Sequence, residues 1–156
     1  MKVFSSTFDA AGHDAPTAHR NPHVAWSDVP EGTRSLVLAA VDVGIPAESD
    51  DLDRPGRAGP ADVPRQEFDH WVLVDIDPAM GEIAAGALGR SGPGGPCPPR
   101  NDGLVHRCVF LLYATDLERV PLGGGFTAAD VLEAIDGHVL DEASFTGHYS
   151  LAPSLA

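Results

Sequence analysis

The chain has 156 residues, with 23 Asp and Glu against 10 Lys and Arg and a formal net charge of −13. A chain of this length can bury about 70% of the surface that its unfolded form exposes, so we expect one domain over residues 1–156 that folds without a disulfide or metal. The negative charge repels nucleic acids and anionic membrane surfaces. A small anion can still bind in a local pocket, because distant charges are screened beyond about 8–10 Å.

The cysteines and the first residues bear on the cellular compartment. Cys97 and Cys108 are too few for a disulfide scaffold, and the segment MKVFSSTFDAAG lacks the apolar core of a signal peptide. We therefore expect a cytoplasmic protein. The longest apolar runs fall far short of the ~20 residues that cross a bilayer, which predicts no integral membrane contact. The sequence indicates no cofactor.

The first half of the chain contains two strand candidates. Residues 3–8 form a short one, followed by a loop rich in His, Pro, Asn and Asp that ends in the turn sequence Pro30-Glu31-Gly32-Thr33. Residues 35–41 (SLVLAAV) are mostly apolar, which predicts a central strand buried on both faces and ending at Asp42. Residues 44–66 mix prolines, glycines and charges without a period, which predicts a long surface loop.

The second half adds two strong strands and a helix. Residues 68–76 (FDHWVLVDI) predict a core strand whose simple alternation places side chains on two faces: His70, Val72, Val74 and Ile76 on one, and Trp71, Leu73 and Asp75 on the other. After a Gly-rich stretch with a strand candidate near Ile83, residues 104–114 (LVHRCVFLLYA) predict a buried strand. A helix is expected from the N-cap Thr127 to about residues 138–143, and a last strand over 144–151.

A proline-rich loop precedes the strand at residues 104–114. Residues 94–99 (GGPCPP) hold three prolines and two glycines, which excludes a helix or a central strand and predicts a stiff loop. This loop leads to His106, near the start of an otherwise apolar strand. An apolar strand has no structural need for an imidazole, so the arrangement predicts a site at this end of the sheet.

Five motifs occur in the order and at the approximate spacing of those in a known family. Trp26 with residues 29–38 (VPEGTRSLVL) is similar to W-x-x-V-P-E-G-T-x-S-L-x-L, and residues 70–73 to H-W-V-L. Residues 95–99 and His106-Arg107 resemble G-P-C-P-P and H-R-Y, and residues 147–149 resemble the G-x-Y that follows the terminal helix. By these motifs the chain resembles the phosphatidylethanolamine-binding protein family, in its bacterial Raf-kinase-inhibitor-like branch.

The resemblance implies a fold and a pocket. The fold is mainly β, with a large antiparallel sheet packed on a smaller one and one or two peripheral helices near the C-terminus. The pocket lies at the sheet edge and binds phosphate-like or carboxylate groups. Its family residues match Asp42, His70, Pro98, Pro99 and His106, and the neighbouring Pro46, Pro96, Cys97, Cys108 and Tyr149 complete the candidate ligand-binding set.

Three departures from the family pattern concern this pocket. The family's D-P-D-A-P is here DVGIP at residues 42–46, so Gly44 replaces the second acid. The tyrosine of H-R-Y is Cys108, and the segment before the proline loop is shorter than usual. We expect a more open pocket of altered polarity, to which the family's ligand preference does not simply transfer.

Two histidines and an aspartate on neighbouring strands permit two kinds of chemistry. They can bind an anion if the imidazoles donate, and binding should tighten as the pH falls, because a carboxylate and a bound phosphate both raise an imidazole pKa from about 6.5. General acid–base catalysis uses the same groups. The structural alternatives are that His70 and His106 bond to backbone carbonyls at the core edge and that Asp42 caps a turn.

The sequence thus predicts a cytoplasmic binding protein for a small anionic group, with a regulatory role by family analogy. The alternative is an enzyme of a specialised biosynthetic pathway in which Asp42, His70 and His106 catalyse an acid–base isomerisation, dehydration or cyclisation of a small organic substrate. A phosphorylated protein as partner follows from family analogy alone. The other five histidines lack metal-ligand spacing, so we expect no metal site. Bacterial relatives often form dimers, which implies a homodimer, although the sequence indicates no interface.

Overall fold

The structure is a computed structural model that describes residues 1–8, 21–46, 64–87 and 106–149. Its elements in chain order are β1 (Lys2–Phe4), β2 (Val24–Ser27), β3 (Ser35–Pro46), β4 (Arg65–Ile76), the 3-10 helix η1 (Pro78–Met80), β5 (Glu82–Ile83), β6 (His106–Thr115), helix α1 (Ala128–Ala134) and β7 (Val139–Tyr149). None of the helices in these ranges is long and apolar enough to cross a membrane.

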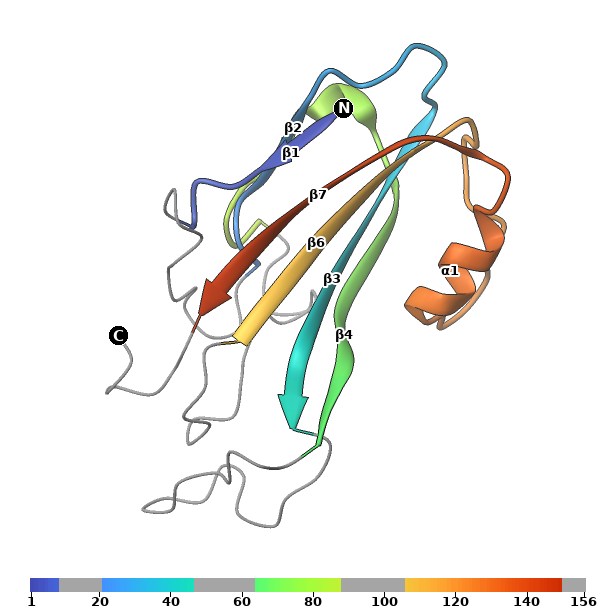
Figure 1. The fold of residues 1–156 in the computed structure, drawn as a ribbon. Coiled ribbons are helices and arrows are strands. Elements are labelled where there is room, and N and C mark those ends of the chain that lie inside the picture. The colour runs from blue at the N-terminus through green and yellow to red at the C-terminus, as the bar shows by residue number, and fades with distance from the viewer. Residues whose placement is uncertain (9–20, 47–63, 88–105, 150–156) are drawn as a thin grey trace.

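The described strands form two antiparallel sheets. The large sheet has the order β4-β3-β6-β7 and the small one the order β1-β2-β5. In Figure 1 the four long strands run side by side, with α1 on one side of them and the β1–β2 pair towards the other. The expected fold, a mainly β architecture with a large and a small sheet and a peripheral helix, is confirmed.

The main core lies between the two sheets. Alternate residues of β3 and β6 face the small sheet, and Leu36, Leu38, Phe110 and Leu112 are fully buried there. Trp26 of β2 packs into the same cluster and donates its indole N–H to the Pro78 carbonyl at 3.1 Å. We call this side of the large sheet the inner face and the side that carries α1 the outer face.

Helix α1 covers one end of the outer face. Thr127 caps it, and the side chain of Asp130 accepts from the Thr127 backbone N–H, which completes a capping box. These hydrogen bonds lower the pKa of Asp130 below its usual value. Val131 and Ile135 then pack on Val37 of β3. The helix is thereby fixed by its cap and by a small second core.

Element boundaries differ from the sequence predictions at several places. β3 continues to Pro46 and β4 begins at Arg65, so the ends of the predicted loop over 44–66 are strands, while residues 47–63 lie outside the described ranges. The helix was predicted too long. It ends at Ala134 with Ile135 as its C-cap, Gly137 at φ 78° lies in the following turn, and β7 starts at Val139, well before the predicted residue 144. β2 was missed, since its four residues sit within a polar, Pro-containing stretch.

The alternation predicted for β4 holds from Trp71 to Val74 but is wrong at His70 and Ile76, because this strand contains two register shifts. Leu36 pairs with Ile76 but Leu38 with Leu73, so β4 gains one residue there, beside Asp75 at φ 57°. As a result Ile76 packs in the main core with Trp71 and Leu73, whereas Val72 and Val74 pack on the outer face. The second shift, at His70, shapes the candidate site described below.

We predict that Gly147→Ala destabilises the fold, because an added Cβ would lie 2.5 Å from Cε1 of Phe8. Phe8 is buried between Phe110 and Phe145 and cannot move freely. The expected cost is about 1–3 kcal/mol in the free energy of unfolding, measured by urea denaturation. Gly125→Ala is the control, since its Cβ would meet nothing within 4 Å. Equal urea midpoints for the two variants would contradict this account of Gly147.

Candidate functional site

Three adjacent strands of the large sheet bring the predicted polar residues together. β3 lies between β4 and β6, and Asp42 of β3 pairs with Phe68 on one side and Cys108 on the other. His70 is two residues from Phe68 along β4, and His106 is two residues from Cys108 along β6. Asp42 and His106 are 64 positions apart in sequence, yet their side chains lie within hydrogen-bond distance of each other.

The centre of the site is the carboxylate of Asp42. Its Oδ2 lies 2.8 Å from Nδ1 of His106 and 3.7 Å from Nε2 of His70. The side chains of Asp42 and His106 are 0% and 1% exposed, and that of His70 is 7% exposed. An ionised carboxylate can only accept, so the short contact places a proton on Nδ1 of His106. Two imidazoles thus share one buried carboxylate.

A β-bulge directs His70 towards this carboxylate. Ala40 pairs with Trp71 and Val41 with Asp69, so one step along β3 corresponds to two along β4, and His70 is the extra residue. A bulge lets two successive side chains lie on one side of a sheet. His70 and Trp71 can therefore both face inwards, which simple alternation would forbid. The bulge was not predictable from the alternation of apolar residues alone.

A second irregularity in β3 fixes the other oxygen of Asp42. Between Asp42 and Ile45 the register shifts by one residue, and the backbone N–H of Gly44 donates to Oδ1 of Asp42 at 2.7 Å. A Cβ at Gly44 would lie 3.6 Å from Oδ1, an ordinary contact. Gly44 stands where the family has a second acid, and its backbone N–H stabilises the carboxylate of Asp42.

Phe68 and Arg65 of β4 are site neighbours that the sequence analysis missed. The ring of Phe68 is edge-on to His70, with centroids 5.3 Å apart, and it is 48% exposed. Arg65 donates from Nη1 to the Gly44 carbonyl at 3.1 Å. The period-two spacing of Phe68 with His70 was the available signal for Phe68, since residues 68 and 70 of a regular strand share a face. Arg65 has no such spacing with His70. Phe68 therefore supplies an exposed aromatic edge beside the less buried histidine.

Cys108 of β6 lies beneath the site, where it pairs with Asp42 of β3. Its side chain is fully buried, and burial together with the nearby Asp42 charge raises the pKa of its thiol. The thiol is therefore neutral at physiological pH and adds no charge to the site. Direct contact between Cys108 and a ligand stays a prediction.

The other predicted ligand-binding residues are placed only in part. Pro46 ends β3 and pairs with Arg65, and Tyr149 ends β7 and pairs with His106, so both backbones lie near the site end of the sheet. Pro96, Cys97, Pro98 and Pro99 lie outside the described residues, and their roles stay predictions. Within the described ranges, no group of three or more His, Cys, Asp and Glu could hold a metal ion.

A cavity adjoins the His70 side of the site. It has a volume of about 320 Å³ and lies between β4 and the start of α1. Its lining residues come from these two segments: Asp69, His70, Trp71, Val72, Phe126, Thr127 and Ala128. Of the triad of Asp42, His70 and His106, only His70 lines this hollow.

Comparisons with known proteins agree with this fold. A family model described as phosphatidylethanolamine-binding protein matches residues 3–150. A UPF0098 protein of Aquifex aeolicus is 34% identical over 170 aligned positions, which cover 96% of this chain and 88% of the relative. The structure of Escherichia coli YbcL, described as a new member of the mammalian PEBP family, superposes with a TM-score of 0.69 at 20% identity, covering 96% of this chain and 97% of YbcL. The putative phosphatidylethanolamine-binding protein homologue CT736 of Chlamydia trachomatis gives a TM-score of 0.68 at 26% identity, with 96% of each chain covered.

We predict that Asp42→Ala strongly destabilises the protein, because it removes the acceptor for Nδ1 of His106 and for the Gly44 N–H, and the carboxylate 3.7 Å from His70. The expected cost is about 3–5 kcal/mol in the free energy of unfolding, and about 1–3 kcal/mol for the isosteric Asp42→Asn. Urea denaturation measures both. The control is Asp116→Ala, which breaks the exposed 2.8 Å pair with His138 and should cost less than about 1 kcal/mol. Similar costs for the two alanine variants would show that the buried carboxylate does not hold the site together.

We also predict that Cys108 resists alkylation in the folded protein. The pKa of this thiol is raised in the folded protein, so the folded state favours the neutral thiol. The free energy of unfolding is therefore unaffected below the pKa of an unfolded cysteine, about 8.5, and falls as the pH rises above that value. Iodoacetamide at neutral pH should leave the Cys108 peptide unmodified in buffer and modify it fully in urea, as read by mass spectrometry. Equal rates in the two conditions would contradict the buried position of the thiol.

Proposed function

Because the chain belongs to the phosphatidylethanolamine-binding protein family, we propose that it is a binding protein for a small anionic group, such as a phosphate or carboxylate, held beside Asp42, His70 and His106. The observation that carries the proposal is the convergence of two imidazoles on one buried carboxylate. A purely structural carboxylate needs hydrogen-bond donors, which backbone N–H groups can supply, so the presence of two imidazoles beside it favours a binding role.

Whether the site favours an anion depends on the net charge of the three side chains, and this charge depends on how many imidazoles are protonated. With both imidazoles neutral the three side chains carry −1, with one protonated they carry 0, and with both protonated they carry +1. An anion in a site of low dielectric constant therefore favours the protonated forms. Binding should be coupled to proton uptake and should tighten as the pH falls.

The surroundings support an anion of modest size. The 320 Å³ cavity beside His70 is at the lower end of the volumes typical of small-molecule sites, about 300–1,000 Å³. Phe68 offers an exposed aromatic edge next to the same histidine. A small anion attached to an apolar or sugar-like body would have both kinds of surface available. The proline loop at residues 94–99 enters this proposal through the sequence resemblance alone.

A second candidate function is an enzyme that performs acid–base chemistry with the same triad. The observation that favours it is the 2.8 Å contact between Asp42 and Nδ1 of His106, because a carboxylate that orients an imidazole is a common arrangement for a general base. In that case His70 or His106 would move a proton on a small organic substrate. A binding protein and an enzyme differ in one respect, since only the enzyme converts its ligand.

We predict that sulfate binds more tightly at low pH. Sulfate keeps its double negative charge between about pH 5.5 and 8, so any pH dependence of binding comes from ionisable groups of the protein. Calorimetric titration should show an affinity at least about tenfold higher at pH 6 than at pH 8. His70→Ala should remove most of this dependence. His138→Ala, on an exposed histidine paired with Asp116, is the matched control and should leave it unchanged.

Three outcomes separate the candidates. Affinity for sulfate that is independent of pH, or unaffected by His70→Ala, would overturn the anion site. Affinity with no chemical change in any organic anion that binds supports the binding protein. Conversion of such an anion that is lost in His70→Ala and inhibited by sulfate would instead establish the acid–base enzyme.

A further inference from the structure

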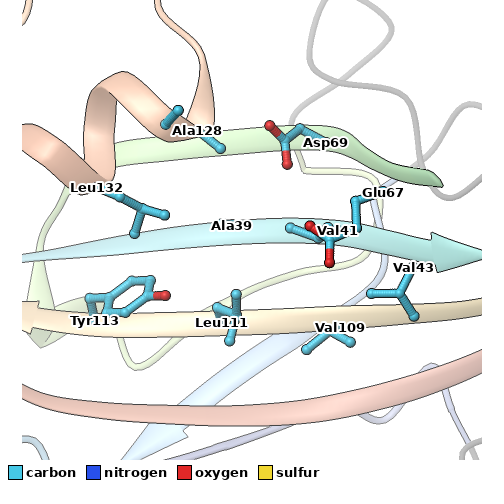
Figure 2. A pocket seen from close by; sticks show the side chains of 11 residues that line it. Ala39, Val41, Val43, Glu67, Asp69, Val109, Leu111, Tyr113, Ala128 and Leu132 are labelled. Carbon is cyan, nitrogen blue, oxygen red and sulfur yellow. The ribbon is translucent and has the colours of Figure 1, made fainter.

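The outer face of the large sheet carries a second hollow that is distinct from the triad. It has a volume of about 340 Å³ and lies between α1 and strands β3, β4 and β6. We call it the outer groove. Its floor includes Val41, Val109 and Leu111, Leu132 of α1 forms one wall, and Glu67 and Asp69 of β4 stand at one edge (Figure 2).

Strand geometry separates the outer groove from the triad. Val41 and Val43 line the groove, while Asp42 between them points to the inner face, where it contacts both histidines. The same holds on β6, where Val109 lines the groove and its neighbour Cys108 is buried in the main core. The outer groove and the side chains of the triad therefore lie on opposite faces of one sheet, whereas the hollow beside His70 shares Asp69 and Ala128 with the groove.

The outer groove combines an apolar floor with negative charge. Eight of its eleven lining residues are Ala, Val or Leu, and the polar ones are Glu67, Asp69 and Tyr113. Among the residues that the structure describes, no Lys, Arg or His lines it. The two carboxylates are on alternate residues of β4, so both face outwards, and Figure 2 shows them on the same side of the groove. Leu132 is still 44% exposed, which leaves apolar surface for a ligand to cover.

A second copy of this chain fits this surface poorly. A twofold interface places the same patch of each copy against the other, so the carboxylates of Glu67 and Asp69 would face a second acidic surface of a chain whose net charge is −13. Like charges brought together across an interface oppose association. Anionic lipids and fatty acids are disfavoured for the same reason. A cation with an apolar body satisfies both the floor and the edge.

We propose that the outer groove binds a small amphipathic cation, an alkylammonium or arylalkylammonium molecule whose apolar part covers Val41, Val109 and Leu111 and whose ammonium group lies between Glu67 and Asp69. This site is separate from the triad, whose side chains meet on the inner face. The protein would then carry two recognition surfaces of opposite charge preference, one on each side of the same strands.

The test uses n-octylammonium as the probe and methyl NMR spectra of the valines and leucines. It should shift the methyl signals of Val41, Val109 and Leu111 and saturate. n-Octanol should bind about three- to tenfold more weakly, because it lacks the two charge contacts, and n-octanoate more weakly still. Shortening the probe to n-hexylammonium should weaken binding by up to about fourfold for each methylene removed.

Charge-neutralising variants test whether Glu67 and Asp69 cause the preference for a cation. Glu67→Gln combined with Asp69→Asn should lower the affinity for n-octylammonium to that for n-octanol and leave n-octanol unchanged. Glu133→Gln, an exposed carboxylate on α1 that does not line the groove, is the matched control and should have no effect. Saturating n-octylammonium should not change the affinity for sulfate, which distinguishes this site from the triad.

Several results would overturn the proposal. They are equal binding of n-octanoate and n-octylammonium, shifts confined to other parts of the protein, and an unchanged affinity in the double variant. Sedimentation analysis tests whether a second copy of the chain occupies the groove instead. A dimer whose formation shifts the same methyl signals, and which n-octylammonium does not disrupt, would show that a second copy occupies the groove.

Discussion

The buried carboxylate of Asp42 is the interaction on which the site end of the molecule depends. It accepts from Nδ1 of His106 and from the Gly44 N–H, and it lies 3.7 Å from His70, so one side chain joins three neighbouring strand segments. A buried carboxylate is costly unless it is paired, so Asp42 requires the donors that surround it. The contacts that stabilise this carboxylate are thus the same contacts that connect β3, β4 and β6 at this end of the sheet.

The sequence allowed the fold class and the three central residues to be predicted, for different reasons. The apolar runs of β3 and β6 made the strands evident, and the resemblance linked Asp42, His70 and His106 into one site; the structure brings these three side chains together. The side-chain directions of His70 and Ile76 on β4 could not be predicted, because the register shifts depend on pairing with β3 and leave no mark in the alternation of apolar residues. The early end of α1 at Ala134 could not be predicted either, because the apolar pattern continues past it to Ile135 and Val139.

Bulges also explain why the histidine and the tryptophan of the HW motif serve different purposes. Trp71 fills the main core against Phe110, with ring centroids 6.1 Å apart, while its neighbour His70 reaches the carboxylate. In a regular strand two successive side chains would lie on opposite faces, and one of these roles would be lost. The extra residue therefore allows a core residue and a site residue to be adjacent in sequence. Phe68 then completes the exposed side of the histidine.

The strict alternation along the middle of β3 has a further consequence for how the protein can change. Val41, Asp42 and Val43 are consecutive, yet the first and third line the outer groove and the second anchors the triad. Substitutions at odd-numbered positions in this segment alter one surface, and those at even-numbered positions alter the other. The residues of the two surfaces therefore alternate along a single strand. Point substitutions can change one surface while the residues of the other surface stay the same.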